Sequence, residues 1–331
     1  FKALEEGQPC EYALWKDFRE LSSREFDRIY DRLVVSFDSY RGESAYSDLI
    51  PPLVEELEEK GILVDSEGAK VVMLDDEGLP PCIVVKSDGS TIYATRDLAA
   101  AKYRYDTYKF YKDVYVVGLP QSLHFRQVFA VLKKAGYDWV DNCVHVGFGL
   151  VKFPEGALLS TRSGDVVYLE DLLDEAVKKT KDIILENNKT RDEVMTEQEI
   201  EETSQAIGLG AIRYTFLRNG REKDIIFRWE DILDFEGDSS PYMQYAYARA
   251  KSIIRKSGYT EDEIMAFEPV RLGEDASFVL AKSIAQLEES LKQAVKAYEP
   301  SIFARQVMTV CRNFSRFYNQ MPILTAPDEE D

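Results

Sequence analysis

The first 80 residues contain two stretches with helical spacing of hydrophobic positions, followed by a region with strand spacing. One stretch covers 26–33. The other starts at Pro51-Pro52 and stops at Gly61, because proline suits a first helical turn and glycine a helix end. From 68 to 95, short β-rich runs alternate with Asp-Glu-Gly and Asp-Gly turns. The apolar positions of the two helices are Phe26, Ile29, Tyr30 and Leu33, then Leu53, Val54 and Leu57.

Between about 82 and 151 the pattern alternates between strand and helix. It predicts strands near 91–95, 114–118 and 143–151, and helices over 97–109 and 122–135. Short connections in such an alternation imply parallel strands with right-handed crossovers. This part therefore predicts an α/β fold with about half of a doubly wound sheet.

Beyond Glu170 the pattern is helical. The polar segment 186–202 predicts a loop and a helix start, and Ser240 as N-cap with Pro241 as first helical residue predicts another start. Two amphipathic stripes follow, so we expect an all-α bundle joined to the sheet by helices between 170 and 219. The stripes are Leu280, Ile284, Leu287, Leu291, Ala294 and Tyr298, then Phe303, Val307, Val310, Phe314 and Phe317.

Composition narrows the class of protein. With 331 residues the chain can form two or three domains, and 45% hydrophobic with 31% charged residues is ordinary for a globular protein. No apolar run approaches the ~18 residues of a membrane span. Four scattered cysteines without a C-x-x-C pair suit free thiols in a reducing cytoplasm, and with only two histidines beside them no metal site is expected. The net charge of −19 argues against broad nucleic-acid binding but leaves room for a local contact.

The helix predicted to start near Ser240 carries candidate chemistry. Tyr242, Tyr245 and Arg249 are spaced i, i+3 and i+7, which places them on one face. Two phenol rings and a guanidinium can stack on unpaired bases and hold a phosphate. Periodicity alone supports equally well a core helix with buried tyrosines.

Three loops are expected beyond the carboxyl ends of the parallel strands, where ligands bind in open sheets. They are 93-YATRD-97, 118-GLPQSLHF-125 and 147-GFGLVKFPEGALLSTRSG-164. None is a G-x-G-x-x-G fingerprint, so an oxidoreductase with a dinucleotide cofactor is disfavoured.

Six segments, in order over almost the whole chain, resemble one family, the class I arginyl-tRNA synthetases. The resemblance implies a partial Rossmann-like parallel sheet with an inserted α+β region, followed by a helical-bundle anticodon-binding domain. The segments are 36-SFDSYRGESAYSDLI-50, 87-SDGSTIYATRDLAAAKYR-104, 115-YVVGLPQSLHFRQV-128, 145-HVGFGLV-151, 158-LLSTRSGDVVYLEDLLDEA-176 and 234-DFEGDSSPYMQYAYAR-249.

We expect the resemblance to divide the chain into four parts. Residues 1–90 would be a connective insertion and the lead-in to the catalytic domain, and 91–170 the second half of that domain. Residues 171–234 would be linking helices, and 235–331 an anticodon-binding domain that is incomplete at its C-terminus.

The resemblance assigns the substrate arginine to Tyr93, Asp97 and Gln121. A carboxylate can form a charge-assisted, bidentate pair with a guanidinium, which lysine or citrulline could not match. Without the family, Asp97 would be read as an ordinary first-turn acid that complements the helix dipole.

ATP contacts come from the next two loops by the same resemblance. Glycines there permit close approach of the backbone to the adenosine, although a lone histidine on a strand is more often structural. The residues expected to bind ATP are His124, His145, Gly147, Phe148, Gly149 and Val151.

The segment 158-LLSTRSG-164 occupies the place of the lysine-rich KMSK loop of class I synthetases, with departures from the pattern. Leu158-Leu159 stands where many relatives have Lys-Met, and Ser163 replaces a frequent lysine. Arg162 is the one cation in the loop, with Lys152 the nearest other. The expected catalytic residues are Ser160, Thr161 and Arg162.

The family's HIGH histidine motif does not occur in the sequence, and the chain does not begin with methionine. We therefore expect a piece of a longer enzyme, itself inactive. The whole enzyme would ligate L-arginine to its tRNA through an arginyl-adenylate, with ATP and Mg²⁺, as a cytoplasmic monomer.

Two other hypotheses stay open besides the oxidoreductase. A class I ligase for another amino acid would share the fold but lack the Tyr93, Asp97 and Gln121 set. The chain by itself could instead act as a tRNA-binding module without catalysis.

Overall fold

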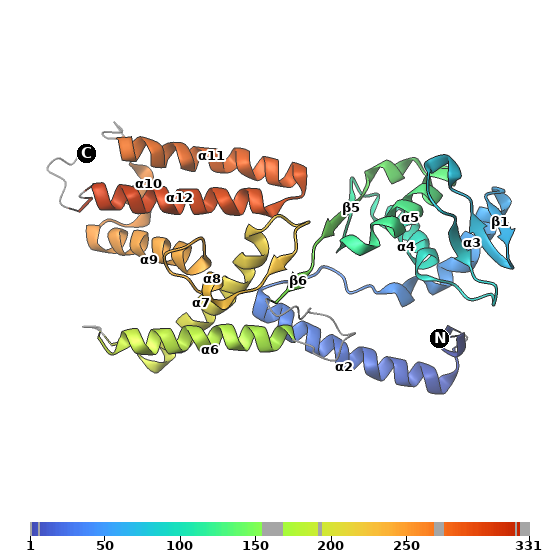
Figure 1. Ribbon diagram of the computed structural model, residues 1–331, viewed down its shortest axis with the longest axis horizontal. Helices are drawn as coiled ribbons and strands as arrows, with labels where there is room; N and C mark the ends of the chain where they lie inside the picture. Colours follow the sequence, from blue (N-terminus) through green and yellow to red (C-terminus); the bar gives the residue numbers. More distant parts are fainter. Residues whose placement is uncertain are drawn as a thin grey trace. The chain divides into compact units, whose positions relative to one another are not determined.

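The computed structural model describes residues 2–5, 7–153, 168–190, 194–267, 275–321 and 323–324. The chain forms two compact units, 1–148 and 149–331, and each is described by itself (Figure 1). Among the helices of the described residues, none combines the length and the apolar character needed to cross a membrane.

The first unit begins with helices and a small antiparallel sheet. Strands β1, β2 and β3 pair in sequence order, with a register irregularity in β2 at Lys70 and Val71. The expected helix at Pro51-Pro52 is confirmed, and Gly61 beyond its end has φ +67°. The elements are α1 (Lys2–Glu5), α2 (Pro9–Leu33), η1 (Glu43–Leu49), α3 (Ile50–Glu59), β1 (Leu63–Ser66), β2 (Ala69–Val72), η2 (Asp75–Glu77) and β3 (Cys82–Val85).

A parallel strand pair follows in the same unit. Strands β4 and β5 pair in parallel from Asp113 opposite Cys143 to Gly118 opposite Phe148, which confirms two of the expected strands and their orientation. Helix α5 ends before Gly136, which has φ +84°. The elements are α4 (Tyr93–Tyr108), β4 (Asp113–Gly118), η3 (Leu119–Gln121), α5 (Ser122–Lys134), η4 (Asp138–Asn142) and β5 (Cys143–Phe148).

The strand expected at 91–95 is wrong, because α4 already begins at Tyr93. Only Thr91 keeps an isolated bridge, to Val85. The amides of Thr95 and Arg96 donate to the Ile92 carbonyl, and the Thr95 hydroxyl donates to the Val84 carbonyl. These bonds close the first turn of α4 at its N-cap, Ile92, and tie that turn to β3, so the helix begins one turn earlier than expected.

The core of this unit lies between α3, β3, α4 and α5. Leu57, Leu98, Val128 and Val131 are almost completely buried. Helix α4 has three consecutive buried alanines, 99–101, and since successive residues point about 100° apart, their burial shows that the helix is covered on more than one side. The core therefore fixes α4 and α5 beside each other, and these two helices carry the first candidate residues.

Glu56 of α3 lies at the centre of a charged cluster in this unit. Its carboxylate accepts from the Tyr137 hydroxyl at 2.6 Å, lies 2.8 Å from Lys60 Nζ and also pairs with Lys102. Lys60 Nζ further donates to the Ala135 carbonyl at 2.6 Å. Partial burial alone would raise the pKa of Glu56, but the bonds from Lys102, Lys60 and Tyr137 outweigh it and lower the pKa from 4.5 to about 2.

Because folding lowers this pKa, ionised Glu56 stabilises the unit at pH values above its unfolded pKa of 4.5. This contribution is lost as the pH falls toward the folded pKa of about 2. Glu56→Gln should cost about 1–2 kcal/mol at pH 7, allowing for screening by water. By pH 3 the cost should fall by more than half. Urea unfolding at both pH values measures it, with the exposed neighbour Glu55→Gln as control. An equal cost at both pH values would contradict the assignment.

The second unit consists mainly of helices. Strand β6 pairs in parallel with β7, and α6 packs against α7, where Gly208 lets the backbones approach closely at Ala176 and Val177. The elements are β6 (Val151–Lys152), α6 (Leu169–Asn188), α7 (Glu197–Arg218), β7 (Ile225–Ile226), α8 (Trp229–Ile232), α9 (Ser240–Ser257), α10 (Glu261–Ala266), α11 (Asp275–Ala297) and α12 (Pro300–Gln320).

The expected bundle is confirmed in outline, with α12 packed between α9 and α11 (Figure 1). Two details differ from the sequence-based expectation. The N-cap of α9 is Ser239, not Ser240, and its hydroxyl accepts from the Tyr242 amide at 3.3 Å. On α11 the expected stripe holds at Ala294, which is buried, and at Leu280, Leu287 and, directly after the helix, Tyr298, which are partly buried, but Ile284 and Leu291 are about half exposed. The other buried positions of this helix are Ala276 and Ser283. Helix α11 packs against α12, and Gln306 Nε2 of α12 donates to the Ser283 carbonyl at 2.7 Å.

Candidate functional site

Helices α4 and α5 bring together Tyr93, Asp97 and His124. Tyr93 and Asp97 are one helical turn apart on α4, and His124 belongs to the first turn of α5. His124 Nε2 lies 2.7 Å from Asp97 Oδ2. The His124 and Tyr93 rings meet edge to face, with centroids 4.7 Å apart. We call these three residues the α4–α5 cluster.

The α4–α5 cluster is open on one side. The His124 side chain is 9% exposed, that of Asp97 is 26% exposed, and Tyr93 is 57% exposed. A carboxylate that is partly accessible next to an aromatic ring can receive a guanidinium, which pairs with the charge and stacks on the ring. Gln121 is exposed at the end of η3, directly before α5 and three positions before His124.

The carboxyl end of β5 holds three residues expected at the nucleotide. His145 Nε2 lies 2.9 Å from the Val117 carbonyl oxygen, and its ring stacks on Phe125 at 4.7 Å. A Cβ on Gly147 would lie 2.7 Å from the Leu119 side chain. Phe148, at the strand end, is 44% exposed. His145 therefore connects β5 to β4 and to α5, while Phe148 presents a ring to solvent.

Gly149 and Val151 belong to the second unit, where they approach the chain's own backbone. The Gly149 amide donates to the Arg221 carbonyl at 2.7 Å, and a Cβ on Gly149 would lie 2.5 Å from the Lys223 carbonyl oxygen. Val151 pairs with Ile225 in the β6–β7 ladder. The close approach that Gly149 permits in this structure is thus to the loop at 221–224. Lys152, the other cation considered for the phosphates, pairs with Asp224 at 2.5 Å.

Gly149→Ala should therefore destabilise the second unit by about 1–3 kcal/mol, because the backbone at Lys223 must move to make room. Urea unfolding measures the change. Gly220→Ala is a matched control in the facing loop, since its Cβ would meet nothing closer than 3.9 Å. Equal stability of the two variants would contradict the packing argument.

The expected catalytic residues Ser160, Thr161 and Arg162 lie outside the described residues. Their expected contact with the triphosphate therefore remains a prediction from the sequence.

On α9 the expected face is present and includes a partner from another helix. Tyr245 is 52% exposed, and Arg249 Nη2 donates to its hydroxyl at 2.5 Å. The Arg249 guanidinium carbon lies 4.6 Å from the Tyr245 ring centroid and 4.4 Å from that of Tyr318 on α12. Tyr242 is half buried, and Ala246, one turn further along the same side of the helix, is buried. The guanidinium is thus held between two rings, and Tyr245 is the most exposed of the three expected residues.

Comparison with known families identifies two domains along the chain. The family model described as tRNA synthetases class I (R), catalytic domain, matches residues 1–229, and that of the DALR anticodon binding domain matches residues 243–331. The chain belongs to the class I arginyl-tRNA synthetases. The resemblance expected from the six segments is confirmed, and so is the fold class of an α/β catalytic part followed by a helical domain.

Curated relatives named arginine–tRNA ligase are similar to this chain. Those of Clostridium kluyveri and Clostridium acetobutylicum are 52% and 50% identical, over 99% and 100% of the chain. The chain spans 57% of the length of each.

Solved arginyl-tRNA synthetases have a similar fold. The crystal structure from Plasmodium falciparum matches with a TM-score of 0.82 at 26% identity, over 95% of this chain and 52% of that one. The Thermus thermophilus structure matches with a TM-score of 0.80 over 99% of this chain and 60% of that one, and its 23% identity shows the fold alone.

Two contacts of this synthetase chain escape sequence reasoning. The bond from His124 to Asp97 joins residues 27 positions apart, and the contact of Tyr318 with Arg249 depends on how α12 crosses α9. The spacing of Tyr93 and Asp97 identifies their shared face but not the histidine opposite. The sequence does offer one signal that His124 belongs to a site, because it lies in the first turn of a helix that follows a parallel strand.

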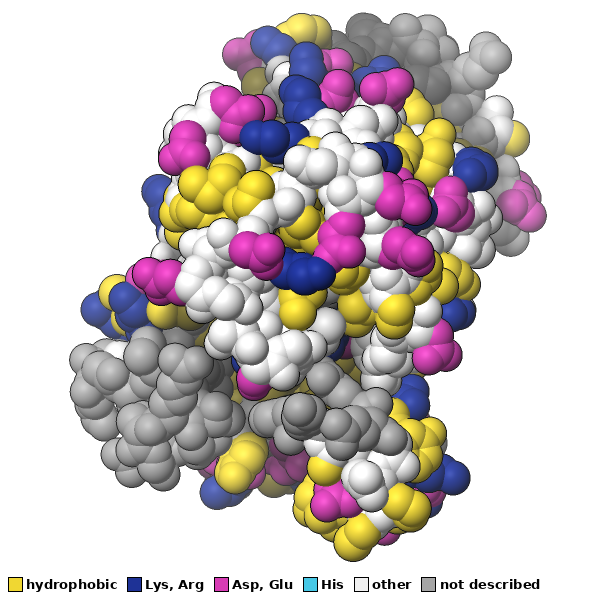
Figure 2. Space-filling model, turned by 90° about the vertical axis from the view of Figure 1, so that its right-hand side faces the viewer, with side chains coloured by type: hydrophobic (Ala, Val, Ile, Leu, Met, Phe, Trp, Pro, Cys, Tyr) yellow, Lys and Arg dark blue, Asp and Glu magenta, His cyan; other side chains and the backbone are white. Residues whose placement is uncertain are grey.

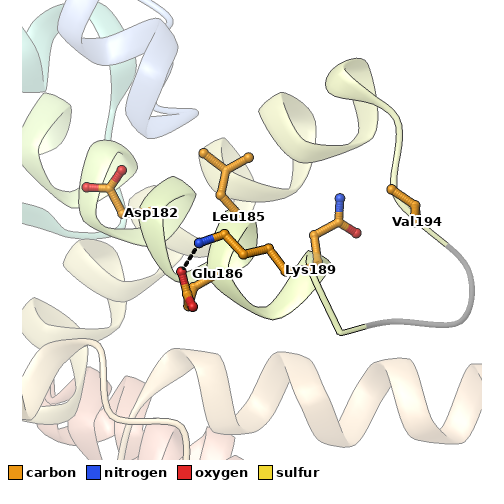
Figure 3. A pocket seen from close by; sticks show the side chains of 6 residues that line it. Asp182, Leu185, Glu186, Lys189 and Val194 are labelled. Atoms are coloured by element: carbon orange, nitrogen blue, oxygen red, sulfur yellow. Dashed lines mark hydrogen bonds and ion pairs between the residues drawn. The ribbon is translucent and has the colours of Figure 1, made fainter.

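Two other surfaces lie apart from the candidate residues. On the face in Figure 2, Lys and Arg side chains are interspersed with Asp and Glu. An open groove at the end of α6 holds Glu186 paired with Lys189 (Figure 3). The Asn188 side chain there bonds the Met195 backbone. These contacts connect α6 to the start of α7, and among the described residues none of those expected at the site lines the groove. Its lining is Asp182, Leu185, Glu186, Asn188, Lys189 and Val194.

Proposed function

We propose that the whole protein attaches L-arginine to its cognate tRNA with ATP. The arginine carboxylate attacks the α-phosphorus of ATP to give arginyl-adenylate and pyrophosphate. A ribose hydroxyl of the terminal adenosine of the tRNA then takes the acyl group, and AMP leaves. The observation that carries the proposal is the partly open Asp97 carboxylate beside the Tyr93 ring, in a chain of this family.

On the amino-acid side, Asp97 pairs with the substrate guanidinium, Tyr93 covers it and Gln121 supplies an amide. This set discriminates by charge and shape, since a neutral citrulline leaves Asp97 without a cation and lysine cannot form the bidentate pair. The 57% exposure of Tyr93 supports such a role, because the ring is available to a ligand.

On the nucleotide side, we propose that Phe148, Gly147 and their neighbours at the end of β5 contact the adenosine. Ser160, Thr161 and Arg162 meet the triphosphate, where a cation and hydroxyl groups stabilise charge on the transferring phosphate. Magnesium enters with ATP, held mainly by phosphate oxygens and water. Within the described ranges no three His, Cys, Asp or Glu side chains gather as a metal cage.

For the tRNA, we propose that the α9 face of Tyr242, Tyr245 and Arg249 contacts the anticodon loop. The division into 1–90, 91–170, 171–234 and 235–331 follows the same assignment of tasks along the chain. We also propose a monomer in the cytoplasm, to which the four free cysteines are suited.

The test is charging of arginine tRNA with labelled arginine by the whole protein. Amino-acid-dependent ATP–pyrophosphate exchange, with tRNA present, separates arginine from the substrates of other class I ligases. Acylation with another amino acid and not with arginine would overturn the proposal. For this chain alone we propose tRNA binding without charging, which filter binding and a charging assay measure together.

A further inference from the structure

The orientation of the Asp97 carboxylate depends on one neighbouring side chain. Asp97 Oδ2 lies 2.7 Å from His124 Nε2, within the range of a charge-assisted hydrogen bond. An ionised carboxylate has no proton to give, so Nε2 must carry the proton and donate it. This bond fixes which nitrogen of the His124 ring is protonated, and it fixes the plane of the carboxylate.

His124 is itself held firmly. Its side chain is 9% exposed. Its ring meets Tyr93 at 4.7 Å and Phe125 at 4.9 Å, both edge to face. The ring therefore has little freedom to turn, and a donor on a fixed ring holds its acceptor in one position. Asp97 remains 26% exposed, so its other oxygen, Oδ1, can face a ligand.

We infer that His124 is a positioning residue for Asp97, and that it acts on the amino-acid side of the site and not on the nucleotide. The Nε2–H donor of His124 orients the carboxylate through Oδ2 and leaves Oδ1 for the substrate guanidinium. It also contacts Tyr93, so one side chain of α5 aligns both α4 residues of the α4–α5 cluster. This inference rests on the proposed binding of arginine by Asp97.

Two variants separate the donor from the ring. His124→Phe keeps an aromatic ring against Tyr93 and Phe125 but has no hydrogen to donate. His124→Gln loses the ring but can present an amide N–H near the place of Nε2. A residue that only fills space would tolerate phenylalanine better than glutamine, whereas a positioning donor requires the opposite order.

The measurement is steady-state arginylation by the whole protein, with KM for arginine and for ATP determined separately and thermal unfolding as a control for folding. We expect His124→Phe to raise the arginine KM at least tenfold with little change in ATP KM or kcat. His124→Gln should stay within about threefold of the wild type.

Four results would overturn the inference. The first is an arginine KM that does not change in His124→Phe. The second is an ATP KM that rises in this variant instead of the arginine KM. The others are an equal loss in both variants at equal thermal stability, and a phenylalanine variant that outperforms the glutamine variant. In all four cases a wild type that charges arginine leaves the proposed function standing. A wild type that fails to charge arginine overturns both.

Discussion

Asp97→Asn is expected to raise the KM for arginine by about 30- to 1,000-fold, which corresponds to about 2–4 kcal/mol. The substitution keeps the shape of the side chain and an oxygen that can accept from His124 Nε2. It removes the negative charge that would pair with the substrate guanidinium. A guanidinium then loses its counter-charge in a partly desolvated site, and this loss costs more than a neutral hydrogen bond.

Arginylation kinetics of the whole protein test this result, and Asp106→Asn is the matched control. Asp106 lies on the same helix, is 60% exposed at its side chain and pairs with Lys109 at 3.4 Å. Its replacement should leave the arginine KM unchanged, since exposed pairs contribute little. An unchanged arginine KM and kcat in Asp97→Asn would remove Asp97 from the binding site.

Tyr245→Ala is expected to weaken binding of arginine tRNA by about 5- to 150-fold, because a stacked base contributes about 1–3 kcal/mol. The ring is half exposed, and Arg249 bonds its hydroxyl. A base can therefore meet a ring whose orientation is already set, so less entropy is lost on binding. KM values for arginine and ATP should change little.

Tyr247→Ala is the control for this prediction. Tyr247 lies two positions further along α9, on another side of the helix, and is 65% exposed. Filter binding or fluorescence anisotropy with arginine tRNA measures the affinities, and circular dichroism checks the helices. The stacking hypothesis fails if tRNA affinity survives in Tyr245→Ala, or if the Tyr247 variant loses as much.

Local signals in the sequence predict much of the fold. Proline and glycine mark α3 correctly, and the alternation from 114 to 148 identifies the β4–β5 pair and α5. The start of α4 was placed too late, because Tyr93, Ala94 and Thr95 suit a strand as well as a helix. The bond from the Thr95 hydroxyl to the Val84 carbonyl, which needs the folded β3, favours the helix.

The candidate site is predicted less completely than the fold. Family motifs identify Tyr93 and Asp97, and helical spacing puts them on one face. Burial of His124 and its bond to Asp97 depend on the packing of α5 against α4, which no local pattern encodes. On α11 two stripe positions, Ile284 and Leu291, are wrong for the same reason, since the choice between Ser283 and Ile284 as the inner position depends on α12.

The short strands β6 and β7 pair with each other, and the part of the chain between them contains α6 and α7. Leu150 and Asp224, 74 positions apart, are joined by a hydrogen bond from the Leu150 amide to the Asp224 carboxylate. Because these two ends of the excursion are bonded, adding or removing residues between them need not separate Leu150 from Asp224. The cost of closing a longer loop grows only slowly, about 0.6 kcal/mol for each doubling. A change in length in a connecting loop of this excursion, outside the packed helices α6 and α7, should therefore leave Leu150 and Asp224 paired.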